Sequence, residues 1–185
     1  MNLNVGLDYW IILDGNYPDF VAGEDYAFAL EVCPSSISRS SVRDRSLRPL
    51  RGAQYQYLGE AVFSSLDLTI LDVGVRCYHE GAVSAPLSVG EFAAGELYLG
   101  VDPFFWKDSL SRRPGMPSLT YRWQVTGISV ETTPWILSHD SRGREIWRHD
   151  DRVAPSFLPV VRTGEGPDDQ KSWHFVLSCE LIGDL

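Results

Sequence analysis

The chain has 185 residues, of which 44% are hydrophobic and 12% aromatic, and its formal net charge is −9. A chain of this length buries roughly 70% of its unfolded surface, so it can fold as one domain, residues 1–185, without a structural metal or disulfide. The aromatic content excludes a disordered polypeptide. The negative charge argues against general binding to nucleic acid or anionic membranes, because both select positive surfaces.

The first part of the chain predicts two strands. Apolar residues alternate from Val5 to Leu13 and again from Tyr26 to Val32, which is the period of two that is typical of a strand. Turn residues separate the two runs, so we expect them to pair as a hairpin with a long connection.

A basic segment follows, from Pro34 to Ala53, in which serine and arginine dominate and the alternation stops. Five arginines stand against one acid, so the segment carries +4 and the rest of the chain carries −13. We expect a surface loop here. Candidate binding residues for an anion or a partner are Arg43, Arg45, Arg48 and Arg51, together with the aromatic anchor Trp106. A solvated loop is the simpler interpretation, because no aromatic residue is interleaved with the arginines.

Strand patterns resume after this segment. They cover Gln54 to Phe63 and Leu66 to Tyr78, where a change of phase near Leu71 predicts a β-bulge. Leu119 to Glu131 is a further strand with a second bulge at Gly127.

The last third of the chain predicts a hairpin and a closing strand. Trp135 to Leu137 and Glu145 to Trp147 flank a polar turn, and Trp173 to Ile182 alternates to the end. A single short helix is expected, within Phe104 to Leu110. Many short strands with glycine and proline turns predict an all-β fold, an antiparallel β-sandwich or partly open β-barrel with long irregular loops.

One short block of sequence occurs twice. Phe20 to Glu24 and Phe92 to Glu96 both place an apolar residue and a Gly-Glu pair before an alternating stretch. An internal duplication of turn-strand units near residues 20–32 and 92–102 would produce this pattern. Independent recurrence is the favoured interpretation, because Gly-acid turns are common before strands. The acids of the two stretches, Glu24, Glu31, Glu96 and Asp102, are expected at the surface.

The cysteines and the N-terminal residues indicate a cellular compartment. Cys33, Cys77 and Cys179 form an odd set in apolar stretches with no CxxC pair, which indicates buried free thiols in a reducing compartment. The longest apolar run near the start is far shorter than the roughly 20 residues of a membrane span. We therefore expect a cytoplasmic protein that does not bind a membrane.

Catalytic motifs are weak. His139, His149 and Asp150 are the least poor candidates for a carboxylate and histidine site, because they lie near the two ends of the predicted hairpin. Solvated turn residues remain the simpler interpretation, since no metal-ligand spacing accompanies them. GxSxG, GxGxxG and P-loop patterns are absent, so the sequence predicts no cofactor and no metal.

Three functions are compatible with these features. The first is an acidic β-scaffold that acts as a protein-interaction module, of the inhibitor, immunity or accessory-subunit type, with a partner that has a basic surface. The second is a hydrolase-like enzyme with a carboxylate and histidine site. The third is an OB-like barrel that binds nucleic acid or a small ligand through the arginine-rich segment. The first is favoured, because no catalytic signature is present and the charge disfavours nucleic acid.

Overall fold

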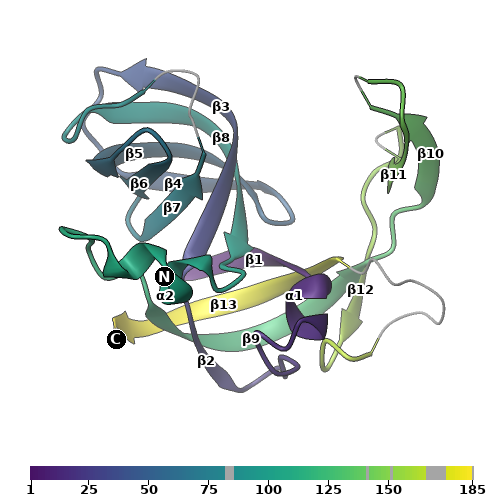
Figure 1. The fold of residues 1–185 in the computed structure, drawn as a ribbon. Helices are drawn as coiled ribbons and strands as arrows, with labels where there is room; N and C mark the ends of the chain where they lie inside the picture. The colour runs from purple at the N-terminus through teal and green to yellow at the C-terminus, as the bar shows by residue number, and fades with distance from the viewer. Residues whose placement is uncertain (82–85, 141, 151, 166–173, 185) are drawn as a thin grey trace.

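The computed structural model describes residues 1–81, 86–140, 142–150, 152–165 and 174–184, and most of their regular secondary structure is β-strand (Figure 1). No helix among them is long and apolar enough to cross a membrane. The strands are β1 (Asn2–Asp8), β2 (Asp25–Phe28), β3 (Leu30–Ser40), β4 (Ser46–Arg51), β5 (Gln54–Ser64), β6 (Leu68–Asp72), β7 (Arg76–Glu80), β8 (Phe92–Val101), β9 (Tyr121–Glu131), β10 (Trp135–His139), β11 (Glu145–His149), β12 (Phe157–Val160) and β13 (His174–Asp184). The helical segments are α1 (Trp10–Leu13), α2 (Phe105–Asp108) and the 3-10 turn η1 (Leu110–Arg112).

One large sheet contains every strand except β10 and β11, in the order β12-β9-β13-β1-β8-β3-β7-β6-β5-β4, with β2 beside β9. An additional pairing of β8 with β5 closes a ring, β3-β8-β5-β6-β7, which the parallel contact of Glu31 with Tyr78 completes. The all-β prediction is confirmed, in the form of a sheet that partly closes into a barrel. The sheet is mixed rather than purely antiparallel, since β1 also runs parallel to β8.

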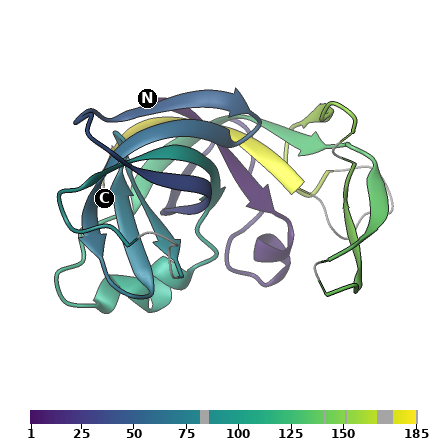
Figure 2. The same ribbon diagram turned by 90° about the horizontal axis from the view of Figure 1, so that it is seen from above.

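The remaining strands extend away from the barrel. The long antiparallel strands β9 and β13 connect the barrel side of the molecule with the side of the β10-β11 hairpin, which stands apart from the barrel (Figures 1 and 2). The N-terminal strand β1 lies between β13 and β8, so it joins the extension to the barrel.

Two apolar clusters hold the fold. The larger lies inside the sheet and includes Trp123, whose ring stacks on Phe28 with 5.7 Å between ring centroids. The smaller lies under α2 and η1 and includes Tyr78 and Trp106. Trp106 is only 2% exposed, so the predicted role of this residue as a surface binding anchor is wrong. Its ring instead packs 5.8 Å from that of Tyr78, because the short helix turns it inward.

The structure corrects the prediction that the basic segment is a loop. Most of the stretch from Pro34 to Ala53 belongs to β3 and β4, not to a loop. The β3 backbone pairs with β8 as far as Ser40, and the Ser38 hydroxyl donates to the carbonyl oxygen of Ala94. Alternation is missing from the sequence because β3 and β4 here expose most of their side chains.

Two other predictions at chain reversals are also wrong. Val5 to Leu13 is not one strand, since β1 ends at Asp8 and a helical turn follows. β1 pairs with β13 and β8 rather than with the second run. Leu66 to Tyr78 is not one strand either, because a hairpin turn divides it: Gly74 adopts a φ of 102°, and its amide donates to the carboxylate of Asp72. A register shift does lie beside Leu71, but the extra residue belongs to β5, between Ala61 and Phe63.

The two copies of the repeated block lie in different structural contexts. Gly23 has a φ of 95° and forms a turn before β2. Gly95 lies inside β8, where a Cβ atom would stand 2.2 Å from the carbonyl oxygen of Ser36. The two glycines therefore serve different purposes, a left-handed turn and a close strand approach. Asp102 is buried rather than exposed, with its carboxylate accepting from the Tyr78 hydroxyl and the Trp106 amide.

Other predictions are confirmed. Gly127 lies at a register shift between β9 and β13, the hairpin forms between Trp135 and His149, and a short helical turn occupies Phe105–Asp108. Cys77 and Cys179 are buried free thiols, whereas Cys33 is exposed. Trp173, the first residue of the predicted closing strand, lies outside the described residues.

Candidate functional site

The β10-β11 hairpin has apolar side chains on both of its faces. Trp135 is paired with His149 and Leu137 with Trp147 on one face, while Ile136 and Ile146 lie on the other. A two-stranded hairpin is marginally stable by itself. Leu137 is nevertheless 48% exposed and Trp147 is 66% exposed, so the hairpin offers apolar surface that the rest of the described chain does not cover.

This exposure continues on the neighbouring strand. Of the sixteen large apolar residues exposed in the described ranges, seven lie between positions 137 and 161. These seven are Leu137, Ile146, Trp147, Val153, Phe157, Leu158 and Val161. We call them the arm surface, with Ile146 on the opposite face of the hairpin from Leu137 and Trp147. β12, which carries Phe157 and Leu158, is an edge strand that pairs only with β9 among the described strands. Clustered apolar exposure beside an open strand edge is typical of a protein-binding surface.

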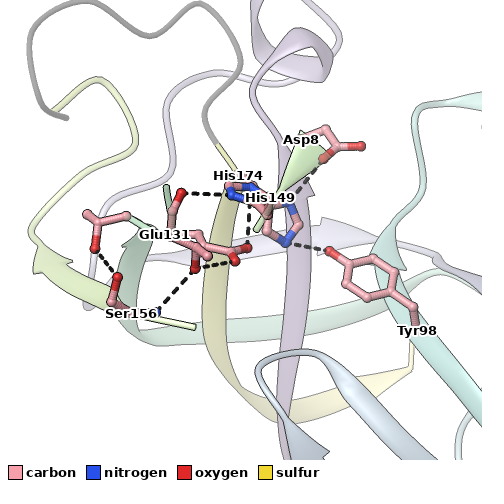
Figure 3. Close-up of polar contacts among 8 residues, drawn as sticks. Asp8, Tyr98, Glu131, His149, Ser156 and His174 are labelled. Atoms are coloured by element: carbon pink, nitrogen blue, oxygen red, sulfur yellow. Dashed lines mark hydrogen bonds and ion pairs between the residues drawn. The ribbon is translucent and has the colours of Figure 1, made fainter. Parts of the chain in front are cut away.

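A polar network, the arm root, connects the hairpin to the end of β9 (Figure 3). The Thr133 hydroxyl donates to Glu131 over 2.7 Å and accepts from the Ser156 amide over 3.2 Å. The His149 Nδ1 atom lies 2.9 Å from the Thr133 carbonyl oxygen, and its ring packs on Trp135 at 3.9 Å between centroids. The root thus holds the base of the hairpin against the body through two strands and a loop.

The proton positions at His149 follow from this geometry. A carbonyl oxygen only accepts, so Nδ1 carries a proton and donates to Thr133. The Nε2 atom is buried, has no hydrogen-bond partner in the described part of the chain, and faces the Glu131 carboxylate at 3.7 Å. Two acceptors therefore face each other unless a proton or a cationic group lies between them.

A second chain of polar contacts lies beside the root. His174 Nδ1 is 3.0 Å from the Asp8 carboxylate, and its Nε2 atom is 2.9 Å from the Tyr98 hydroxyl (Figure 3). The hydrogen bond from His174 lowers the pKa of Asp8, so Asp8 is ionised and accepts. With the neutral imidazole, Nδ1 then donates to Asp8, and the Tyr98 hydroxyl donates to Nε2.

Tyr98 and Glu131 line the same small pocket. Its space is about 110 Å³, and the lining also includes Arg51, Gln54, Phe157 and His174. Gly6 makes room for Tyr98, because a Cβ on Gly6 would lie 1.4 Å from the Tyr98 hydroxyl oxygen. Burial, and then the charges of Asp8 and Glu131, raise the pKa of Tyr98 well above its usual range. Tyr98 therefore stays a phenol, which suits a hydrogen-bonding role better than that of a nucleophile.

The predicted catalytic residues do not come together. Trp135 pairs with His149 and His139 pairs with Glu145, so the two histidines lie at opposite ends of the hairpin. His139 is exposed at the tip. The Asp150 carboxylate is held by Arg152, and this hydrogen bond lowers the pKa of Asp150 to about 2. Of the three residues only His149 belongs to a network with Glu131.

The predicted binding arginines are spread around the barrel. Arg43 lines one shallow pocket and Arg48 lines another. Arg45 forms ion pairs with Glu60 and Asp72, while Arg51 lines the pocket with Tyr98. The four side chains thus do not form one cluster, although Arg51 does reach the polar pocket.

Comparison with family models, with curated proteins and with solved structures finds no match for this chain. The site must therefore be interpreted from its own geometry. Within the described ranges, no group of three or more histidine, cysteine or acidic side chains could hold a metal ion.

The sequence patterns do not identify Asp8, Tyr98 and His174, which the fold brings together. Asp8 and His174 are 166 positions apart, and Tyr98 and His174 are 76 apart. In the sequence each belongs to an ordinary alternating stretch, so no spacing marks them. The alternating pattern identifies the apolar residues of the hairpin as strand residues, but it does not indicate whether another part of the protein covers their face.

Proposed function

We propose that this protein is a protein-interaction module that docks its partner on the arm surface. The observation that carries the proposal is the concentration of exposed apolar side chains on the β10-β11 hairpin and the β12 edge. Trp147 is the main anchor, since exposed tryptophans that become buried dominate the binding energy of interfaces. The open edge of β12 suits the addition of a strand from the partner.

Charge defines the kind of partner. The chain carries −9 overall. Residues 137–162 hold five arginines against four acids, so the negative charge that would repel a second copy and attract a basic partner lies on the body beside the arm. A partner with a basic surface around an apolar patch would be attracted and oriented by this field. The binding partner is therefore a basic protein rather than a copy of this chain.

The other two functions have less support. An enzyme site built on His139, His149 and Asp150 lacks the necessary proximity. Nucleic-acid binding through the arginines lacks stacking aromatics, because Trp106 is in the core and the arginines diverge. The buried thiols Cys77 and Cys179 fit a reducing compartment, so we place the proposed interaction in the cytoplasm.

The test compares capture by four proteins: the unaltered chain, Leu137→Ser, Trp147→Ser and Leu66→Ser. Leu66 is 93% exposed in the connection between β5 and β6, so its variant is the matched control for loss of an exposed apolar residue. We expect a basic protein from extract to be retained by the unaltered chain and the control, and lost by both arm variants. Retention should weaken as salt rises.

Two outcomes would overturn the proposal. One is capture that all four proteins share, since that binding does not use the arm. The other is a dimer in sedimentation experiments that Trp147→Ser abolishes, because the arm would then serve self-association. Thermal unfolding of each variant serves to establish that the arm substitutions leave the body folded.

A further inference from the structure

We propose that the pocket between Tyr98, Glu131 and His174 receives the ammonium group of a lysine side chain from the docked partner. This inference rests on the proposed function and names the group that the partner must present. The pocket lies next to the arm root, and Phe157 belongs both to its lining and to the arm surface. A partner that contacts Phe157 on β12 therefore lies beside the pocket.

Several polar groups of the pocket act as hydrogen-bond acceptors. With a neutral His174 whose Nδ1 donates to Asp8, the Tyr98 hydroxyl donates to Nε2, so the lone pairs of its oxygen are left to accept. Glu131 uses one carboxylate oxygen for the Thr133 hydroxyl, and its other oxygen faces the unpartnered Nε2 atom of His149 at 3.7 Å. The Gln54 side chain offers a further acceptor at the lining. A ligand that brings several donors and no acceptor, such as an ammonium, satisfies these groups.

The shape and the apolar part of the lining suit the stem of the same side chain. Pro155, Phe157 and Val176 contribute carbon surface, against which the methylene groups of a lysine pack while the charged end reaches polar atoms. The space of about 110 Å³ equals roughly four water molecules at 30 Å³ each. That volume accepts a narrow aliphatic amine more readily than an aromatic ring.

The charged groups around the pocket favour a cation, with one exception. Glu131 belongs to the lining, and Asp8 is hydrogen-bonded to the far nitrogen of His174. After burial, these two carboxylates are the main cause of the raised pKa of Tyr98, which indicates a negative local potential. Arg51 at the rim opposes a second cation, and protonated His174 or His149 would do the same. Removal of the Arg51 charge should therefore tighten binding.

Binding of n-butylammonium, followed by the ¹⁵N signals of the His174 imidazole, tests the pocket without the partner. We expect a saturable shift in the millimolar range with n-butylammonium, and none with butyrate or n-butanol at equal concentration. Glu131→Gln retains an acceptor for Thr133 and should weaken binding about tenfold or more, because a charged hydrogen bond is lost. Tyr98→Phe should also weaken it, whereas Arg51→Gln should tighten it about twofold.

Glu180→Gln is the matched control, since Glu180 is an exposed acid on the same strand as His174 and outside the pocket lining. The inference is overturned if butyrate binds as well as n-butylammonium, or if Glu131→Gln and Glu180→Gln weaken binding equally. Should Glu131→Gln unfold, Tyr98→Phe and Arg51→Gln still decide the matter by their opposite signs.

The two proposals fail separately. If the amine does not bind but Trp147→Ser still loses the partner, the arm proposal stands and the pocket proposal does not. If the amine binds but arm variants keep the partner, the pocket is an amine site unrelated to docking, and the lysine assignment is wrong.

Discussion

Gly6→Ala tests how the pocket is built. Gly6 lies in β1 between β13 and β8, opposite Val176 on one side and Gly100 on the other. An added Cβ would stand 1.4 Å from the Tyr98 hydroxyl oxygen and 2.2 Å from the ring carbon Cζ. The ring must move, because the backbone of a central strand is fixed by both neighbours. Overpacking of this kind costs about 1–3 kcal/mol, and the lost hydrogen bond to His174 adds about 1 kcal/mol.

The net loss should be about 1–3.5 kcal/mol, since alanine regains roughly 0.5–1 kcal/mol over glycine inside a strand. Urea unfolding followed by tryptophan fluorescence measures it, with Gly183→Ala as control because no atom lies within 4 Å of a Cβ there. The double variant Gly6→Ala/Tyr98→Ala should lose less stability than the sum of the two single variants, since the clash partner is gone. A Gly6→Ala protein within about 0.5 kcal/mol of the parent, with the His174 signal unchanged, would refute the packing argument.

Three further predictions concern stability. Burial, and then the charges of Asp102, Glu80 and Asp8, raise the pKa of Glu31 from 4.5 to about 7. Folding therefore favours the protonated acid. The free energy of unfolding should fall as the pH rises from about 4.5 to 7. Glu31→Gln should remove this slope and stabilise the protein at pH 8 by about 2 kcal/mol, with no gain at pH 4, as measured by urea unfolding; equal stability of both proteins across the range would contradict it. Trp106→Ala should cost about 3–5 kcal/mol because the ring is in the core, a loss visible in the urea midpoint. Trp147→Ala should change the free energy of unfolding by less than about 0.5 kcal/mol. A large loss would show that the hairpin supports the body.

The strands could be predicted where one face is buried. Tyr55 and Tyr57 in β5 are buried while Gln54 and Gln56 are exposed, and that alternation is visible in the sequence. β4 could not be found in this way, because both of its faces are polar or exposed. Its pairing depends on β5 as a neighbour, which is a property of the assembled sheet.

The site could not be predicted for a related reason. Asp8, Tyr98 and His174 belong to three strands whose order β13-β1-β8 brings them together. Strand order depends on long-range pairing, which local periodicity does not encode. The mixed-sheet contacts, such as Gly6 with Gly100, are the kind of information that a single sequence lacks.

The pairing of β1 with β13 has a consequence for how the chain reaches this structure. The first strand bonds along its whole length to the last, from Asn2 with Glu180 to Asp8 with His174, and β13 also supplies the main partner of β9. Contacts this distant in sequence make folding slow, because a very long loop must close before they stabilise anything. During synthesis, the barrel strands β3 to β8 can associate as they emerge, and β9 can pair with β2 and β12. β1 and β9 gain their common neighbour only when β13 is made. The hairpin with its exposed Trp147 is made before β13. Until β13 is added, the growing chain therefore presents this apolar surface to chaperones and to premature association.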